Sequence, residues 1–161
     1  MSRFIARFNL GLGALAGAAT VLLMLSVVPD LLSRSLFGVA IYGMAEASTM
    51  LLVFIVFLAL PAAQVRREHF QVTLLDNVLP ARGVRALLVA RHLASAAVTG
   101  LFAWYATTGA WESTLRLEQS YAVVAFPVWP GRIATAAGLV LLTVQFLIDA
   151  WHDLRAPAGQ A

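Results

Sequence analysis

The sequence predicts an all-α integral membrane protein with four transmembrane helices, and three observations support this fold class. Hydrophobic residues make up 61% of the 161 residues and charged residues only 12%, about half the charged fraction of an average soluble domain. The mean hydropathy is +0.84. Long uncharged stretches recur along the chain. A soluble chain of this length could not bury so much apolar surface, so we expect one membrane domain over residues 1–161.

The first predicted span covers roughly residues 10–32. Its basic start and apolar run are similar to a signal peptide, but the run is longer than a usual signal core, so we expect an uncleaved span. Gly13 and Gly17 form a GxxxG pair, through which a partner helix can approach closely. A chance pairing in a segment rich in Gly and Ala is the alternative. Pro29 predicts a bend near the membrane surface.

The second predicted span, residues 45–65, has an uncharged centre between Glu46 and the run of charged residues at 66–69. Its length suits the roughly 20 residues that cross a bilayer core. Charged side chains at bilayer depth are usually paired or functional, which singles out Glu46. Arg34 is the nearest basic residue on the same side. We predict that the two pair with each other or with a partner subunit; the alternative is a Glu46 solvated among the headgroups.

A short amphipathic helix is expected between spans two and three, roughly at residues 71–79, because apolar side chains recur there at helical spacing. Span three is expected at residues 86–111 and ends in aromatic residues that favour the headgroup level. An apolar run broken by Pro127 and Pro130 then predicts an interfacial or re-entrant segment before span four, at residues 133–151.

The arginines predict the orientation, since cytoplasmic loops carry an excess of basic residues. With both termini in the cytoplasm, eight arginines lie inside and three outside. The inner set is Arg3, Arg7, Arg66, Arg67, Arg82, Arg85, Arg91 and Arg155, and the outer set is Arg34, Arg116 and Arg132. No basic run with interleaved aromatics supports binding to nucleic acid.

No set of residues predicts catalysis. The chain has no Cys and no Ser-His-Asp set, phosphate loop or HExxH motif. Asp149 and Asp153 could serve acid–base chemistry, although a solvated helix face is the commoner explanation. His69, His92 and His152 raise the possibility of haem or metal binding, but they lie near span ends without a second ligand one turn away. We therefore expect no catalytic residue, no substrate-binding residue, no metal and no cofactor.

The order and spacing of several short motifs resemble the small membrane subunit (DctQ-like, Q subunit) of tripartite ATP-independent periplasmic (TRAP) transporters. These motifs are Arg34, then Glu46 at the start of span two, then RREHFQV at 66–72, and finally SYAVVAFPVW at 120–129, which resembles the family's Ser-then-Pro-x-Trp approach to the fourth helix. The resemblance covers about residues 5–152. Glu68 stands where the family usually has Gly, Phe70 where Ile is usual, and Thr73 where an acid is common.

The resemblance implies a non-enzymatic permease subunit in the bacterial inner membrane. It implies a scaffold for a large M subunit, which carries the substrate and ion sites, in the ion-coupled uptake of organic acid anions such as dicarboxylates. A periplasmic substrate-binding protein would deliver the anion, and membrane lipids would surround the helices. Residues expected to be structural or to lie at a subunit interface are Arg34, Glu46, Arg67, His69, Ser120, Pro127, Trp129, Gly13 and Gly17.

Two other functions stay open at the level of sequence. One is a small redox anchor or haem-binding protein that uses histidines at the membrane boundary. The other is a self-contained four-helix carrier or channel, which the shortage of polar residues within the spans disfavours, because a transport path needs lining groups.

Overall fold

The computed structural model describes residues 2–65, 81–120 and 125–155, and within them the regular structure is helical apart from one isolated bridge. Each of its four helices is long and apolar enough to cross a membrane, which confirms the predicted all-α membrane fold. Each helix also includes the range expected for its span. The predicted interfacial helix at residues 71–79 lies outside the described residues.

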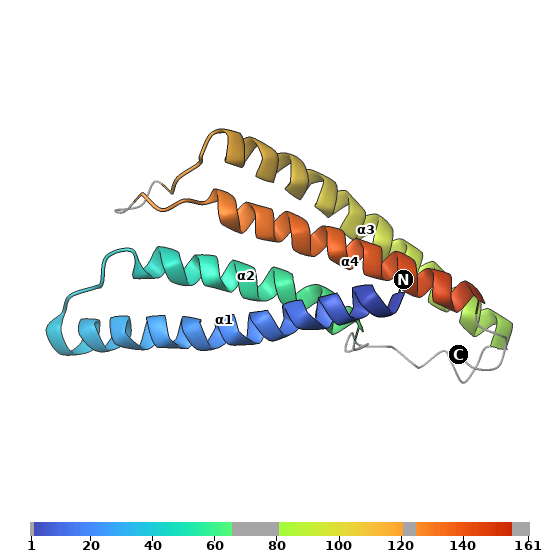
Figure 1. Cartoon of the computed structure of the whole chain (residues 1–161), viewed down its shortest axis with the longest axis horizontal. Helices are drawn as coiled ribbons and strands as arrows, with labels where there is room; N and C mark the ends of the chain where they lie inside the picture. Colours follow the sequence, from blue (N-terminus) through green and yellow to red (C-terminus); the bar gives the residue numbers. More distant parts are fainter. Residues whose placement is uncertain (1, 66–80, 121–124, 156–161) are drawn as a thin grey trace.

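Two antiparallel hairpins make up the bundle (Figure 1). α1 (Ser2–Phe37) packs against α2 (Met44–Val65), and α3 (Ala81–Leu115) packs against α4 (Trp129–Arg155). Contacts between α2 and α4 join the hairpins. The connections from α1 to α2 and from α3 to α4 lie at one end of the molecule, here called the loop end. The start of α1 and the end of α4 lie toward the opposite end, the terminal end, and the hairpins diverge toward the loop end (Figure 1).

α1 is longer than the span predicted inside it. Its 36 residues extend about 54 Å at helical rise, well beyond a hydrocarbon core of about 30 Å. The helix continues past Pro29 for two more turns, so Arg34 belongs to the helix and not to a linker. It ends at Phe37, and the positive φ of 67° at the following Gly38 allows a left-handed cap in which the Gly38 N–H donates to the Arg34 carbonyl at 3.1 Å.

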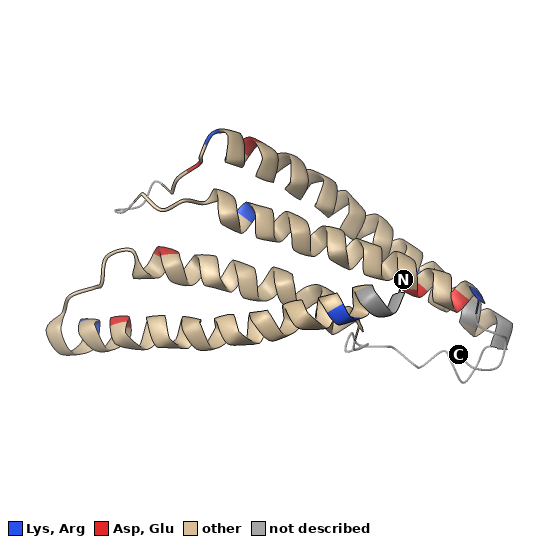
Figure 2. Cartoon of the chain, viewed as in Figure 1, with Lys and Arg blue, Asp and Glu red and all other residues tan. Residues whose placement is uncertain are grey.

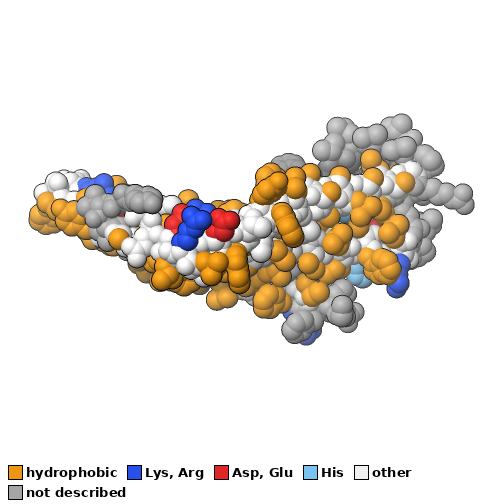
Figure 3. All heavy atoms as spheres, turned by 90° about the horizontal axis from the view of Figure 1, so that it is seen from above, with side chains coloured by type: hydrophobic (Ala, Val, Ile, Leu, Met, Phe, Trp, Pro, Cys, Tyr) orange, Lys and Arg blue, Asp and Glu red, His pale blue; other side chains and the backbone are white. Residues whose placement is uncertain are grey.

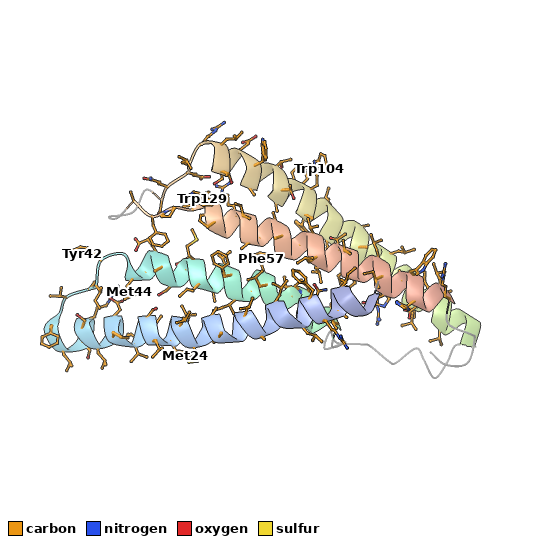
Figure 4. All side chains as sticks on the ribbon, viewed as in Figure 1. Met24, Tyr42, Met44, Phe57, Trp104 and Trp129 are labelled. Atoms are coloured by element: carbon orange, nitrogen blue, oxygen red, sulfur yellow. The ribbon has the colours of Figure 1, made fainter. Side chains whose placement is uncertain are left out.

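The closest contact between the hairpins is at Gly138 of α4. A Cβ at this position would collide with the backbone carbonyl of Phe57 on α2 and would lie 2.9 Å from the Phe57 Cβ. Two turns earlier, a Cβ on Gly131 would lie 2.7 Å from the Met50 sulfur. Figure 4 labels Phe57 on α2. Glycine therefore allows α2 and α4 to pack with their backbones almost in contact.

α4 is the central helix of the bundle. Of its most apolar stretch, 39% is buried, against 6% for α1. One face meets α2 through the glycines above, and another meets α3, where the Thr143 hydroxyl donates to Thr99 at 3.1 Å. Leu142 and Phe146 form a small buried core with Ala96 of α3. Other buried apolar residues, including Ala16 of α1 and Ala62 of α2, lie outside this small core.

The outer faces of α1 and α3 remain apolar and exposed. Met24 is 62% exposed and Trp104 is 69% exposed, and both point away from the other helices (Figure 4). Apolar side chains cover much of the face seen in Figure 3, where one cluster of basic and acidic side chains interrupts them. Charged residues of the described helices lie toward the helix ends (Figure 2). This distribution is that of a bundle whose middle faces lipid or another apolar surface.

Candidate functional site

The loop end contains a cavity of about 440 Å³ between the first turns of α2, the segment before α4 and the first turns of α4. Its polar lining includes Glu46, Ser120 and Arg132, and its apolar lining includes Met50 and Phe126. Glu46 and Ser120, two of the predicted interface residues, are far apart in sequence but line the same cavity.

Glu46 lies in the first turn of α2, where a negative charge interacts favourably with the helix dipole. Among the described residues it forms no ion pair. The nearby Arg132 guanidinium instead binds the Glu118 carboxylate at 2.7 Å. The cavity wall thus contains the acid Glu46 and an arginine whose charge is compensated by Glu118, which is not among the lining residues.

Arg34 is bound within its own helix. Its Nε donates to the Asp30 carboxylate at 2.8 Å, and the other Asp30 oxygen accepts the Ile41 N–H at 2.9 Å. No ion pair joins Arg34 to Glu46 in the part of the chain that the structure describes. The predicted pairing inside the chain is therefore not formed, because Asp30 lies one helical turn from Arg34; pairing of Glu46 with a partner subunit stays a prediction.

The segment around Ser120, Pro127 and Trp129 folds back on itself before α4. The Ser120 N–H donates to the Phe126 carbonyl at 2.8 Å, and the Val128 N–H donates to the Glu118 carbonyl at 2.9 Å. Gln119 and Pro127 form an isolated bridge, and Trp129 begins α4. These bonds hold Ser120 and Phe126 at the cavity, while Arg67 and His69 lie outside the described residues.

The two glycines of the GxxxG pair occupy different environments. A Cβ on Gly13 would lie 2.6 Å from the Ala62 Cβ, so Gly13 lets α1 and α2 approach closely within the chain. A Cβ on Gly17 would meet nothing within 4 Å, and Gly17 is exposed. Only Gly17 is left open to a neighbour outside this chain.

A second polar group of residues, here called the polar cluster, joins three helices near the terminal end. It consists of Asn9 on α1, Gln64 on α2, and Gln145 and Asp149 on α4. The Asn9 amide donates to the Gln145 Oε1 at 3.2 Å. Gln145 and Gln64 each donate to one oxygen of the Asp149 carboxylate, at 3.0 and 2.8 Å. Asp149 therefore belongs to a partly buried network and not to the solvated helix face that the sequence favoured.

The sequence interpretation missed Asn9, Gln64 and Gln145. Each is a lone amide in an apolar stretch, and their side chains are almost fully buried, with 0%, 4% and 5% of their surface exposed. The signal was present, since isolated amides inside apolar helices usually bond across helices. Of these contacts, only the one between Gln145 and Asp149 could be predicted from the sequence, because residues four apart on a helix are neighbours.

His92, on α3, makes its contacts with α4. The His92 Nε2 lies 3.3 Å from the Asp153 carboxylate, and its ring contacts Phe146, with ring centroids 6.1 Å apart. His152 is exposed and His69 lies outside the described residues. Among described residues, no group of three His, Cys, Asp or Glu side chains is placed to hold a metal ion.

Comparison with known protein families identifies a match to a family of transporter components. The family model for the DctQ component of tripartite ATP-independent periplasmic transporters matches residues 23–156. No curated protein and no solved structure matches the chain. The family match covers α2, α3 and α4, the part of α1 from residue 23 onward, and every residue that lines the cavity at the loop end.

Proposed function

The chain belongs to the DctQ family of small TRAP transporter subunits, and from this premise we propose that it is the membrane scaffold for the large M subunit. The family is a transporter component and not an enzyme family, and the four apolar helices make the chain a multi-pass inner-membrane protein. In the proposal, the complex takes up organic acid anions, coupled to an ion gradient, after a periplasmic binding protein delivers them.

The observation that supports a scaffold most strongly is the distribution of exposed apolar surface. The outer faces of α1 and α3 are exposed along most of their length, while α4 is the most buried helix, with 39% of its most apolar stretch buried. In lipid, exposed apolar surface does not by itself make helices associate. Close packing of small residues does. The exposed small residues Ala14, Gly17 and Ala18 on α1 meet that requirement, so α1 is the proposed contact with the M subunit.

The orientation proposed from the arginines places the loop end in the periplasm. The cavity with Glu46, Ser120 and Arg132 then faces the side from which a binding protein arrives. The described helices carry few charged side chains in their middle regions (Figure 2), which suits a supporting subunit better than a path for an anion. The family match gives no support to the alternative of a haem-binding redox anchor.

Co-purification tests the scaffold. The tagged chain is expressed with the proteins encoded beside it and isolated in mild detergent, and we expect one large membrane protein to remain bound. A chain that purified alone with a haem spectrum, or that transported an anion by itself in liposomes, would overturn the proposal.

A pair of glycine variants tests the contact on α1. Gly17 and Gly11 are both open, with nothing within 4 Å of an added Cβ, but helical geometry separates their directions by about 120°. We expect Gly17→Leu to release the large subunit, because the bulk blocks close packing, and Gly11→Leu to retain it. Equal retention by both variants would place the contact elsewhere.

A further inference from the structure

The cavity at the loop end has a charged mouth and an apolar interior. Glu46 lies in the first turn of α2, whereas Met50 and Val53 line the cavity one and two turns deeper along the same helix. At helical rise, the distance from Glu46 to Val53 along the helix axis is about 10 Å. Arg132 lies in the first turn of α4 and belongs to the same mouth. The lining therefore changes from charged to apolar toward the middle of the bundle.

The mouth of the cavity lies at the level of the lipid headgroups. Tyr42, shortly before α2, and Trp129, at the start of α4, lie at this end of the molecule (Figure 4), and such aromatic side chains favour the headgroup level. After Glu46, α2 carries no further charged residue. The interior of the cavity, next to Met50 and Val53, therefore lies within the hydrocarbon core.

The charges at the mouth favour an occupant that brings both a cation and an anion. Glu46 forms no ion pair with any described residue, and residues 121–124, next in sequence to the lining residue Ser120, contain no basic side chain. A carboxylate at the membrane boundary is usually paired. The Arg132 Nη2 binds Glu118 at 2.7 Å, but a guanidinium has five N–H donors and can also bind a phosphate.

A phospholipid presents its groups in the same order as the cavity lining, with a charged headgroup at the boundary and acyl chains toward the bilayer middle. A basic side chain inserted from the aqueous side would present them in reverse, because its charged tip would arrive beside Met50 and Val53. The cavity volume of about 440 Å³ lies within the range of small-molecule sites. It equals roughly fifteen waters at about 30 Å³ each, which is room for a phosphoethanolamine group and the first carbons of one acyl chain.

We propose that the cavity at the loop end binds the headgroup of phosphatidylethanolamine, with the start of one acyl chain against Met50 and Val53. The primary ammonium donates to the Glu46 carboxylate, and the phosphate accepts from Arg132. A choline headgroup has no N–H to donate, and a glycerol headgroup brings a negative charge beside Glu46 without a cation, so both should bind more weakly. The lipid would occupy the space between α2 and α4 where the hairpins diverge (Figure 1). The proposal requires only that the chain spans a membrane and is independent of any partner protein.

Thermal unfolding of the delipidated full chain in detergent tests the proposal, with Trp fluorescence as the readout. Phosphatidylethanolamine, phosphatidylcholine or phosphatidylglycerol with identical acyl chains is added to the micelles. If phosphatidylethanolamine reaches about ten times its dissociation constant, we expect a saturable rise in Tm of about 3–6 °C over the other two lipids. Equal Tm values in phosphatidylethanolamine and phosphatidylcholine would overturn the proposal and leave Glu46 to a basic side chain of another subunit.

The soluble headgroup tests the apolar interior separately. We expect glycerophosphoethanolamine, which lacks acyl chains, to leave Tm unchanged at the same concentration, because the surfaces of Met50 and Val53 would stay uncovered. A rise equal to that with the intact lipid would overturn the assignment of the interior to an acyl chain.

A pair of acid variants locates the lipid. We expect Glu46→Gln to lose the difference in Tm between phosphatidylethanolamine and phosphatidylcholine, because a neutral amide no longer attracts the ammonium. The control Glu112→Gln, at an exposed acid of α3 that does not line the cavity, should keep it. Persistence of the difference in Glu46→Gln would overturn the assignment. Should that variant fail to fold, the lipid extracted from the unaltered chain after purification decides: one retained phosphatidylethanolamine per chain supports the site, and no retention, or no preference over phosphatidylcholine, refutes it.

Discussion

Replacement of Gly138 by Ala tests the packing that joins the two hairpins. The added methyl group would collide with the Phe57 carbonyl, lying 2.7 Å from its carbon and 2.9 Å from the Phe57 Cβ. Because two of these three contacts are backbone atoms, no side-chain rotation can relieve the collision. α2 and α4 must separate at their crossing, and the contact between Gly131 and Met50 then loosens as well.

The magnitude follows from two opposing terms. Ala is favoured over Gly within a helix by about 1 kcal/mol, whereas forcing an extra methyl group into a well-packed site costs typically 1–3 kcal/mol or more. A collision with backbone belongs at the upper end of that range, so we expect a net loss of about 1–2 kcal/mol. Gly100→Ala is the matched control: its methyl group would lie 3.5 Å from the Thr143 Cγ2, an ordinary contact. That variant should gain up to about 1 kcal/mol.

Thermal unfolding of the two variants measures this difference. At about 2–4 °C per kcal/mol for a chain of this size, Gly138→Ala should lower Tm by about 2–8 °C and Gly100→Ala should raise it by a few degrees. A Gly138→Ala chain as stable as Gly100→Ala would show that α2 and α4 do not pack with their backbones in contact, and would refute the arrangement of the two hairpins.

Two further substitutions test the polar contacts of the loop end. Asp30→Ala should destabilise the chain by about 1–2 kcal/mol, more than Arg34→Ala, because Asp30 pairs with Arg34 and also accepts the Ile41 N–H; equal Tm losses for the two variants would contradict this role. Arg132→Ala should change stability by less than about 1 kcal/mol, since its pair with Glu118 is 45% and 35% exposed. A double-mutant cycle by thermal unfolding measures that pair, and a coupling well above this bound would mean that the pair is buried.

Composition and motif order were sufficient for the fold class and the family. Four uncharged stretches of bilayer length leave few alternatives to a helical bundle, because unpaired backbone groups are not tolerated in lipid. The resemblance to the DctQ-like subunit was confirmed by the family match over residues 23–156. The ends of the helices were harder to predict. α1 continues past Pro29 to Phe37, because a helix can extend beyond the hydrocarbon core until a capping residue ends it.

The sequence predicted contacts between individual residues least well. Arg34 was matched with Glu46 because they are neighbours in sequence order, but the helix brings Asp30 to within 2.8 Å of Arg34. Gly13 and Gly17 were treated as one motif, yet only Gly13 faces α2. The GxxxG motif indicates that a neighbouring helix can approach closely. Which of its two glycines meets a neighbour depends on which face of α1 packs against α2.

The amino-acid sequence alone determined that this protein is a four-helix membrane subunit, because hydropathy and helix length are local properties of each segment. Only the tertiary structure decided that Asn9, Gln64 and Asp149 belong to one network and that Glu46 shares a cavity with Ser120. These residues come from α1, α2, α4 and the segment before α4, and the crossing of α2 over α4 at Gly138 sets the relative height and rotation of those two helices. Such a crossing depends on the simultaneous fit of two helix surfaces, which no single segment encodes.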